Sequence, residues 1–561
     1  MKKLISMLMA AAMVLSLAAC GAKTPAASSA GEQIKLTIGV PASNTVSDWE
    51  NNALTKWLEE QTGYDLDFFY FSSTQSEYKT QLTTMMAADE KLPDILLNLN
   101  LSADERNNYA NEGIFVDLAK YYDDEAYMSQ FEWYQMIQEN VDADILQRAW
   151  VEGRSPNGEW WGAISELANK NTDGPRYMTY INQNWLDKLG LEMPRTYDEL
   201  VTVLEAFRTQ DPNGNGKQDE IPMIGTENVL RGEVDCWLIN RHEYLNRTYP
   251  YNVDENGKLY SPYTTDAYRR GLQDVRELVS KGLLSPLTWT IKERTEIVSM
   301  VTPADDTAIL GVWGGHLTLN CTENSPVMLE YQPLPPLEGS YAAMNPSKLT
   351  YMTFITSDCE HPDEAFNLIM TLSSFEGARR QRYGAPDVDW VPAVDAETGI
   401  EGIQILNNSA FSGPTSSTYG FTCGVTYWDP EDEVKANGQP KDPSPNYVAD
   451  PNPAGTELTW AQERSTRNEA HYKAYKEAAE ANNPKDITYT LIYDEAETER
   501  RGDIQTNVSS YVQQARAEFA NGTRDINSDA DWNAYLQDLE SIGIDTVVEC
   551  AQSAWDRQNS R

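Results

Sequence analysis

IKLTIGV at 34–40, ALTKWLEEQTG at 53–63 and YDLDFFYF at 64–71 together decide the fold class of this chain. In the first segment apolar residues alternate with polar ones, which is typical of a β-strand. The second repeats apolar residues at helical spacing and ends on a glycine, the favoured residue just beyond a helix C-terminus. A strand, a helix and a strand in this order predict a βαβ unit with two parallel strands.

The same alternation continues to residue 99. A capping box formed by Ser47 and Glu50 predicts where the first helix begins. A second helix is expected over 76–88 and a third strand over 94–99. This βαβαβ order predicts a parallel sheet, in which ligands bind at the carboxyl ends of the strands.

The chain is too long for a single core, because it has 561 residues. A second α/β region is expected from 177 to 320, and a long helical stretch over 120–149 precedes a turn-rich hairpin at 153–161. The proline-rich stretch 427–455 reads equally as an ordered loop, a lid or solvated filler. We therefore predict an α/β protein of two to four domains.

The sequence DPNGNGKQDE at 211–220 has the residue order that a hard divalent cation requires. An EF-hand loop provides oxygen ligands at alternate positions and a glycine at the sixth position. Calcium would bind the side chains of five residues and the backbone carbonyl of a sixth: Asp211, Asn213, Asn215, Lys217 (carbonyl), Asp219 and Glu220. The alternative is a solvated loop built from Asx turns.

The flanks of this loop argue for a structural ion. A capping box at Thr196 and Glu199 predicts a helix before the loop, and 221–225 reads as a short buried strand after it. The expected order is helix, calcium loop and strand. In an EF-hand the loop lies between two helices, so this arrangement is a different one. A cation here would attach a helix to the edge of a sheet.

The first twenty residues read as an export signal. Lys2 and Lys3 precede an apolar run over 4–19 that is too short to span a bilayer as a folded helix. The run ends in LSLAAC, which resembles the lipobox of bacterial lipoproteins and implies cleavage before Cys20 and lipidation of its thiol. Residues 20–33 would then be a lipidated, flexible tether. An ordinary signal peptide that happens to end at a cysteine is the alternative.

The formal net charge of −42 argues against nucleic acid and anionic membrane surfaces as partners. It also disfavours a polyanionic ligand, unless a local basic cleft overrides the average. The cysteines after Cys20 are odd in number and widely spaced, so we expect small buried apolar residues rather than disulfides or a zinc site: Cys236, Cys321, Cys359, Cys423 and Cys550.

The stretch Asn184–Pro222 closely resembles a signature of extracellular solute-binding lipoproteins of bacterial carbohydrate ABC importers, the group that includes LplA-like and alginate-binding proteins. Four shorter motifs are similar to other parts of that family: KLPDILL at 91–97, NGEWWG at 157–162, GTRDINSDADWNAYLQDLESIGID at 522–545 and AWDR at 554–557. The resemblance extends across nearly the whole chain after Cys20.

The resemblance implies a type II periplasmic-binding-protein-like fold, in which two α/β lobes close on an oligosaccharide in the cleft between them. Residues 34–163 and about 346–398 would form the first lobe, and residues 164–345 and about 399–561 the second, with the calcium loop. The family's structural calcium ion maps onto the six ligands named above. The chain would be a monomer on the extracellular face of the membrane, anchored only by lipid, and would deliver sugar to ABC permease subunits.

A sugar site needs flat aromatic rings for stacking and a few convergent polar groups. Trp313, in ILGVWGGH, follows an expected buried strand and precedes two glycines, which predicts an exposed turn. Further candidates are tryptophans near turns and asparagines after the first and third strands: Trp160, Trp237, Trp289, Trp390, Trp428, Asn44 and Asn98. The alternative is that the tryptophans are buried in the core and the asparagines are solvated loop residues, because the sequence pattern is the same in both cases.

Three rival functions remain open. A surface lyase or glycosidase would need a carboxylate pair, which 86 acidic residues do not exclude, although no GxSxG, HExxH or GxxxxGK motif is present. The histidines show no ligand spacing and read as ordinary: His242, His316, His361 and His471. A calcium-dependent adhesion module would be expected to carry two such loops. A binding protein for peptides or other solutes differs only in its ligand. We expect a non-enzymatic binding protein.

Overall fold

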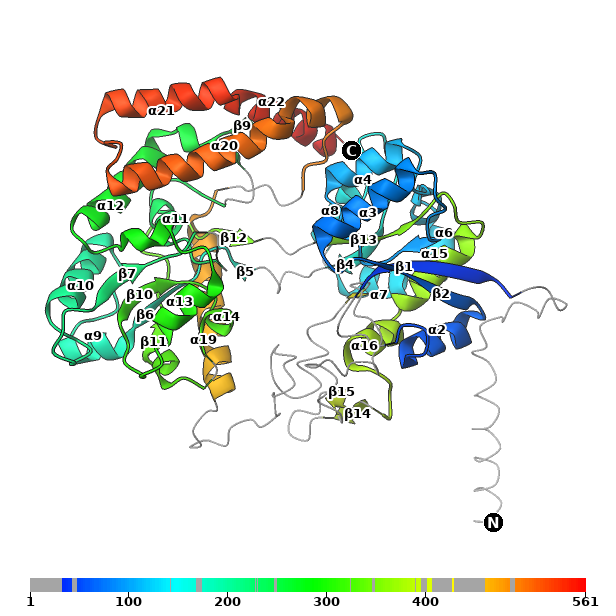
Figure 1. Ribbon diagram of the computed structural model, residues 1–561, viewed down its shortest axis with the longest axis horizontal. Coiled ribbons are helices and arrows are strands. Elements are labelled where there is room, and N and C mark those ends of the chain that lie inside the picture. The colour runs from blue at the N-terminus through cyan, green and yellow to red at the C-terminus, as the bar shows by residue number, and fades with distance from the viewer. Residues whose placement is uncertain are drawn as a thin grey trace, which may run out of the picture.

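A computed structural model describes residues 33–42, 48–141, 143–167, 174–227, 229, 231–246, 250–322, 324–345, 349–388, 390–394, 401–405, 426–427, 460–484 and 490–560. These residues form two α/β lobes that lie side by side, with the C-terminal helices stacked on the second lobe (Figure 1). Each lobe is built on a sheet of its own. The two-lobed α/β architecture expected from the sequence is therefore confirmed.

The first lobe is organised around a six-stranded sheet with the strand order β16-β4-β13-β3-β1-β2. Its strands are β1 (Lys35–Pro41), β2 (Asp65–Phe71), β3 (Ile95–Leu96), β4 (Ala163–Leu167), β13 (Leu349–Ile355) and β16 (Thr426–Tyr427). Strand β1 pairs in parallel with β2 and β3, whereas β13 is antiparallel to β3. The βαβαβ unit predicted from the sequence forms the parallel part of this sheet.

Nine helices belong to this lobe in the described residues: α2 (Ala53–Thr62), α3 (Gln75–Ala87), α4 (Ala103–Asn111), α5 (Ala119–Tyr122), α6 (Glu125–Met128), α7 (Glu132–Asn140), α8 (Ala143–Glu152), α15 (Pro362–Leu372) and α16 (Phe375–Tyr383). Helix α2 starts later than predicted, because the Asn52 side chain, rather than Ser47, caps it by accepting from the Thr55 N–H. Its end at Gly63 is as predicted.

The stretch 120–149 is mostly helical, as expected, but it is divided into four short helices. Asp123 terminates α5, and the Asp124 side chain then caps α6 by accepting from the Tyr127 N–H. Aspartate side chains compete with the helical backbone for hydrogen bonds, which explains the break.

The second lobe has a four-stranded sheet with the order β11-β6-β10-β7. Its strands are β6 (Thr179–Asn182), β7 (Ile221–Ile224), β10 (Leu310–Gly314) and β11 (Tyr331–Pro333). Strands β7 and β10 are parallel, so their carboxyl ends lie at the same edge of the sheet. Strand β6 runs antiparallel to both β10 and β11.

The helices of the second lobe are α9 (Gln183–Leu189), α10 (Tyr197–Thr209), α11 (Val234–Ile239), η2 (Pro262–Thr264), α12 (Asp266–Ser280), η3 (Pro286–Trp289), α13 (Arg294–Val301), α14 (Leu317–Asn320), η4 (Pro326–Glu330), α19 (Trp460–Asn482), α20 (Glu495–Asn521), α21 (Asp529–Ile542) and α22 (Ile544–Asn559). The predicted capping box of Thr196 and Glu199 starts α10. Gly543, which adopts a left-handed φ of 108°, ends α21 as predicted.

Separate hydrophobic cores support the division into lobes. One core contains the second sheet together with residues of α19 to α22, and two others lie around the first sheet. The four cysteines in the described residues are buried and free of disulfides, as expected: Cys236, Cys321, Cys359 and Cys550. Cys423 lies outside the described residues.

Short two-stranded pairs complete the fold. They are β5 (Gly174–Pro175) with β12 (Met344–Asn345), β8 (Asn252–Val253) with β9 (Leu259–Tyr260), and β14 (Trp390–Val394) with β15 (Glu401–Ile405). The β5–β12 pair lies where the chain passes from one sheet to the other and back (Figure 1). The expected inclusion of the whole of 399–561 in the second lobe fails at β16, which pairs with β4 of the first sheet.

Candidate functional site

The carboxyl ends of β7 and β10 meet through two glycines. A Cβ on Gly314, the last residue of β10, would lie 2.5 Å from the carbonyl oxygen of Gly232. A Cβ on Gly232 would lie 2.2 Å from the Thr226 hydroxyl oxygen. Only glycine permits this approach, so the turn that follows β7 packs directly on the end of β10.

That turn is held rigidly by its own hydrogen bonds. The Thr226 N–H donates to the Gly232 carbonyl at 2.9 Å, and the Thr226 hydroxyl donates to the Val229 carbonyl at 3.0 Å. Arg231 adopts a left-handed φ of 69°, which is uncommon for a residue with a side chain. Its carbonyl accepts from the Met178 N–H at 3.0 Å, so the turn is also fixed to the connection between β5 and β6.

His471 belongs to α19, which lies on the side of the second lobe that faces the first (Figure 1). Its Nε2 accepts from the Thr179 N–H at 3.1 Å, and its ring stacks on Tyr475 with centroids 4.7 Å apart. Complete burial lowers the pKa of His471 to about 3, and the nearby charges of His316 and Arg231 add to this effect. The imidazole is therefore neutral near pH 7.

Several hydrogen-bond donors at this edge have no acceptor. Because Nε2 of the neutral His471 ring accepts, Nδ1 carries the proton, and this buried Nδ1 has no partner among the described residues. The same holds for the buried Nη1 of Arg231 and for Nδ2 of the fully buried Asn320. The amide oxygen of Asn320 accepts from the His316 N–H at 2.8 Å, which orients the side chain over the turn after β10.

Sequence reasoning missed this cluster. It treated His316 and His471 as ordinary, because no spacing along the chain connects them. The tertiary fold brings them together by packing α19 against the strand ends. The one usable signal was the Gly-Gly-His run at 314–316, which correctly located the end of a strand.

Trp313 does not lie on an exposed turn, contrary to the prediction. All five residues of β10 are buried, and the Trp313 ring is fully inaccessible, stacked on Tyr180 with centroids 5.1 Å apart. A strand between two neighbours, covered on both faces, buries every side chain. The strand was expected to end before Trp313, but it continues to Gly314, so the indole belongs to the core.

Three other tryptophans that were predicted to contact a ligand are also buried: Trp160, Trp237 and Trp289. Trp160 stacks on Tyr122 at 4.3 Å and donates its indole N–H to the Gly162 carbonyl. Trp237 is 4% exposed and Trp289 is 6% exposed. Large aromatic side chains bury more apolar area than any others, which favours core positions. The positions of Asn44 and Trp428 and the side chain of Trp390 lie outside the described residues.

Two residues at strand ends of the first lobe remain accessible. Asn98, just after β3, is partly exposed and adopts a left-handed φ of 61°. Tyr70, near the end of β2 and paired in register with Val40, is 47% exposed. This exposed ring was not predicted, because the apolar run DFFYF gives no clear alternation.

The loop over 211–220 connects α10 to the edge strand β7, as predicted. Asp211 accepts from the N–H groups of Gly214 and Gly216, at 3.1 and 3.0 Å. Asn213 and Asn215 both donate side-chain N–H bonds to Asp219 at 3.1 Å. Both glycines adopt left-handed φ angles, 74° and 75°. The tight turns seen here are those of an Asx-rich loop.

The acidic residues of this loop repel one another. Partial burial, together with the carboxylates of Asp211 and Asp219, raises the pKa of Glu220. Its buried Oε1 has no hydrogen-bond partner in the described part of the chain. No three His, Cys, Asp or Glu side chains of the described residues converge as around a metal ion. The orphaned carboxylate oxygen fits a cation, and the remaining ligands would be the carboxylates of Asp211 and Asp219, two amide oxygens and one backbone carbonyl.

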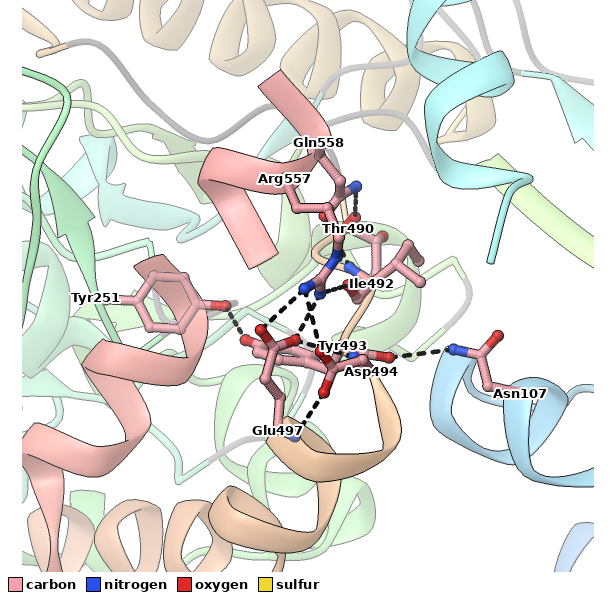
Figure 2. Close-up of polar contacts among 9 residues, drawn as sticks. All are labelled: Asn107, Tyr251, Thr490, Ile492, Tyr493, Asp494, Glu497, Arg557 and Gln558. Carbon is pink, nitrogen blue, oxygen red and sulfur yellow. Dashed lines mark hydrogen bonds and ion pairs between the residues drawn. The ribbon is translucent and has the colours of Figure 1, made fainter. Parts of the chain in front are cut away.

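The segment Thr490–Arg501 links the lobes at a further crossing (Figure 2). The Thr490 N–H donates to Glu152 of α8 at 3.0 Å, and the Asn107 amide of α4 donates to the Tyr493 carbonyl at 3.3 Å. Arg501 also forms an ion pair with Asp104 of α4. These contacts tie the segment to the first lobe.

The segment Thr490–Arg501 is also attached to the second lobe. Arg557 of α22 pairs with Glu497 at 2.5 Å and donates to the Ile492 carbonyl at 3.0 Å (Figure 2). The hydroxyls of Tyr251 and Tyr493 lie 2.8 Å apart. A polar cavity of about 380 Å³, lined in part by Asn107, Tyr493 and Asp494, lies beside this crossing.

The fold is that of two-lobed solute-binding proteins. A protein described as an "HMO binding ABC-transporter associated Solute Binding Protein", from Bifidobacterium longum infantis, superposes with a TM-score of 0.71 at 21% identity, covering 94% of this chain and 99% of that chain. At this identity the likeness establishes the fold. No protein-family model matches the chain.

Proteins that resemble this chain in sequence include an ABC transporter substrate-binding protein and a lipoprotein. The fructooligosaccharide ABC transporter substrate-binding protein FusA of Streptococcus pneumoniae is 27% identical over 291 residues, 48% of this chain and 50% of FusA. Lipoprotein LipO of Bacillus subtilis is 28% identical over 284 residues, 51% of each chain. The chain therefore spans about half the length of the relatives it matches.

A solved structure of FusA shares the fold. It is described as an EF-hand mutant in complex with fructo-nystose, and it superposes with a TM-score of 0.64 at 20% identity, covering 94% of this chain and 99% of FusA. These comparisons confirm the resemblance to substrate-binding proteins of carbohydrate ABC transporters.

The predicted signal peptide, Cys20 and the tether lie outside the described residues. Within the described ranges, no helix has both the length and the apolar character needed to cross a bilayer.

Replacing Gly314 with Ala is expected to destabilise the second lobe by about 1–3 kcal/mol, because the new Cβ would overlap the Gly232 carbonyl. The strain would also displace the turn that carries Arg231. Urea unfolding measures the loss of stability, and a change of less than about 0.5 kcal/mol would contradict the close contact.

Replacing His471 with Gln is expected to weaken the acid sensitivity of the fold. The imidazole has its ordinary pKa of 6.5 when unfolded and about 3 when folded, so the unfolded state binds more protons between these values. Stability is therefore lost as the pH falls below about 6.5 and is unaffected above it. The variant should reduce this slope by up to about 1.4 kcal/mol per pH unit.

Urea midpoints at pH 7 and pH 4.5 measure this slope in both proteins. Gln retains an acceptor for the Thr179 N–H, which limits other damage. The matched control is His361→Gln, since His361 lies at the surface with its side chain 44% exposed. Equal slopes in the wild type and the His471 variant would show that this ring is not buried as a neutral group.

Proposed function

We propose that this chain is the substrate-binding subunit of an ABC importer, which captures an oligosaccharide between two closing lobes and delivers it to membrane permeases. The observation that carries the proposal is the pair of lobes with separate cores, joined by the β5–β12 pair and by the segment Thr490–Arg501. Residues 34–167, which include β4, with about 346–398, and 168–345 with about 399–561 except β16, are the proposed lobes.

Hinge closure is the proposed mechanism. A ligand that contacts both lobes stabilises the closed state in proportion to its higher affinity for that state. The strand ends of the second lobe, with Arg231 and His471, and those of the first, with Tyr70 and Asn98, are the proposed binding surfaces. No covalent step is needed, so we propose that the protein is not an enzyme.

We further propose a structural calcium ion in the loop 211–220. The orphaned Glu220 carboxylate oxygen and the mutual repulsion of the acidic residues support a bound cation. The proposed ligands are those expected from the sequence: Asp211, Asn213, Asn215, Lys217 through its carbonyl, Asp219 and Glu220. Bound there, calcium would fix the end of α10 to the edge strand β7.

Attachment to the membrane through a lipidated Cys20 is the proposed location, on the extracellular face of a bacterial cell. The motif LSLAAC supports it, as does the similarity to a protein named as a lipoprotein. Metabolic labelling of growing cells with an alkyne-tagged palmitate would test it. Label should appear on the wild-type chain and be lost from Cys20→Ala.

A thermal-shift screen over a panel of neutral and acidic oligosaccharides tests the function. At least one should raise the melting temperature, bind in calorimetry and reduce the radius of gyration in X-ray scattering. Chromatography of the recovered glycan distinguishes a binding protein from an enzyme, because the ligand should return unchanged. If no oligosaccharide shifts the melting temperature, sugar binding must be abandoned in favour of another solute.

A further inference from the structure

We propose that the segment Thr490–Arg501 is a latch that holds the two lobes in an open arrangement. The segment stays attached to the second lobe, and its contacts with α4 and α8 of the first lobe separate when the lobes close. This inference rests on the proposed function, because it concerns the closing motion that binding of an oligosaccharide would drive.

The segment Thr490–Arg501 belongs to the second lobe. Gln558 of α22 holds it at two points (Figure 2). The Gln558 side chain accepts from the Ile492 N–H at 2.9 Å and donates to the Thr490 carbonyl at 3.1 Å. Tyr493 is part of the same hydrophobic core as the second sheet and α22. The segment therefore moves with the second lobe.

The contacts of this segment with the first lobe are few. They are the hydrogen bonds of the segment with Glu152 and Asn107, and the ion pair between Arg501 and Asp104. No other hydrogen bond or ion pair between two described residues joins the lobes. Away from the segment the described parts of the lobes make no polar contact, which is the open arrangement. These contacts hold the lobes in that arrangement.

The contacts can break and form again at little cost, because all of them are polar. A hydrogen bond within the protein is exchanged for bonds to water when it breaks, so its net contribution is small. The cavity of about 380 Å³ lies between the exposed residues Asn111 and Asn157 of the first lobe and Glu495 and Glu499 of the segment. A polar interface of this kind allows domains to move relative to each other.

The latch and the proposed binding surface of the second lobe lie on opposite sides of the β5–β12 pair. In Figure 1 helix α20 lies above this pair, whereas α19, which carries His471, extends below it. Lobes that rotate about the crossings beside the pair close below it while α4 and α8 move away from the segment above it. A contact present only in the open arrangement opposes closure.

A bend in α20 marks the end of the latch. The helix departs from helical geometry at Gly502, with φ −6° and ψ −106°, and Arg501 immediately before the bend pairs with the first lobe. After the bend, Val508, Val512 and Phe519 are buried in the core of the second lobe. The bend therefore separates the part of α20 that contacts α4 from the part that packs on the second lobe.

Single-molecule Förster energy transfer measures the latch without any glycan. The dyes are attached to Ser299→Cys on α13 and Glu376→Cys on α16, two exposed positions on opposite lobes that lie below the β5–β12 pair in Figure 1. Cys20 and Cys423 are replaced with Ser, and the other cysteines are buried. Asp104→Ala should raise the ratio of closed to open molecules by about three- to ten-fold, because the open arrangement loses its ion pair.

A matched control separates the latch from a general effect of charge. Asp198 lies two residues after the cap of α10, as Asp104 does in α4, and both helices begin with a capping box. Asp198 is exposed and forms no ion pair among the described residues. Asp198→Ala should therefore leave the ratio of closed to open molecules unchanged.

Gly502→Ala tests the bend without any change of charge. Alanine favours a continuous helix more than glycine does, and a Cβ at this position would meet no atom within 4 Å. A straighter α20 would move Arg501 away from Asp104, so the ratio of closed to open molecules should rise. The urea midpoint of each variant confirms that it is folded.

An unchanged or lower ratio in folded Asp104→Ala would overturn the proposal, and so would an equal rise in Asp198→Ala. Absence of closed molecules from both the wild type and Asp104→Ala counts as an unchanged ratio. An unchanged ratio in Gly502→Ala would contradict the part assigned to the bend. The measurement contains no glycan, so its failure leaves the proposed function in place. A screen in which no oligosaccharide binds would remove the proposed function and leave the measured latch.

Discussion

The Asp235→Ala variant is expected to lower the free energy of unfolding of the second lobe by about 3–5 kcal/mol. Asp235 of α11 and Arg516 of α20 form an ion pair at 2.7 Å, and both side chains are 2% exposed. Removing the carboxylate leaves a buried guanidinium without its counter-ion. The Trp289 indole N–H, which donates to Asp235 at 3.0 Å, would also lose its acceptor.

The position of the pair gives the variant a structural consequence. It joins the first helix after β7 to the long C-terminal helix α20, two elements far apart in sequence. Its loss should therefore release the C-terminal helices. Hydrogen exchange is expected to accelerate in α20 before it does so in the six-stranded sheet of the first lobe.

The double variant Asp235→Leu/Arg516→Met is the matched control. Replacing both charged partners with apolar residues removes the desolvation cost together with the attraction, so most of the stability should return. Guanidinium denaturation followed by circular dichroism measures all three proteins. A loss below about 1 kcal/mol in Asp235→Ala would mean that the pair is hydrated in solution.

Removal of calcium is expected to have the second large effect. If the ion is present at about a thousand times its dissociation constant, its removal lowers the free energy of unfolding by about 4 kcal/mol. The expected result is a clear drop in the urea midpoint on adding EGTA, restored by excess calcium. The reason is that Asp211, Asp219 and Glu220 then repel one another without a cation.

Controls separate a specific site from a general effect of salt. Magnesium at equal concentration should restore much less stability, because it requires a stricter octahedral geometry. Asp219→Asn should be less stable in calcium and nearly insensitive to EGTA. A wild-type midpoint that does not respond to calcium would support the alternative of a solvated Asx-turn loop.

The sequence predicted the local elements well where short-range rules apply. The strand Ile221–Ile224, the capping box at Thr196 and the helix stops at Gly63 and Gly543 all follow from residues a few positions apart. The start of α2 was predicted wrongly, because Ser47 and Asn52 offer competing caps and local rules do not rank them. The second cap is the one that places Leu54 and Leu58 in the core.

The tryptophan predictions failed for a related reason. Trp313 was placed on a turn after a strand, whereas it lies within β10, and the sequence carries no information on which elements cover that strand. The stacking of Tyr180 on the indole depends on pairing between β6 and β10. The local sequence pattern indicates that Trp313 lies near the end of a strand. Its burial depends on residues that are distant in sequence and pack on that strand.

The amino-acid sequence by itself determined the α/β class, the order of strands and helices, the acidic loop and the resemblance to solute-binding lipoproteins. These depend on periodicity, capping and motifs within short stretches of chain. Only the tertiary structure decided which polar groups meet at the end of the second sheet. Arg231, Asn320 and His471 come from three separate segments, and their unpaired donors become visible only when every neighbouring acceptor has been placed. Hydrogen-bond satisfaction is a property of the packed molecule.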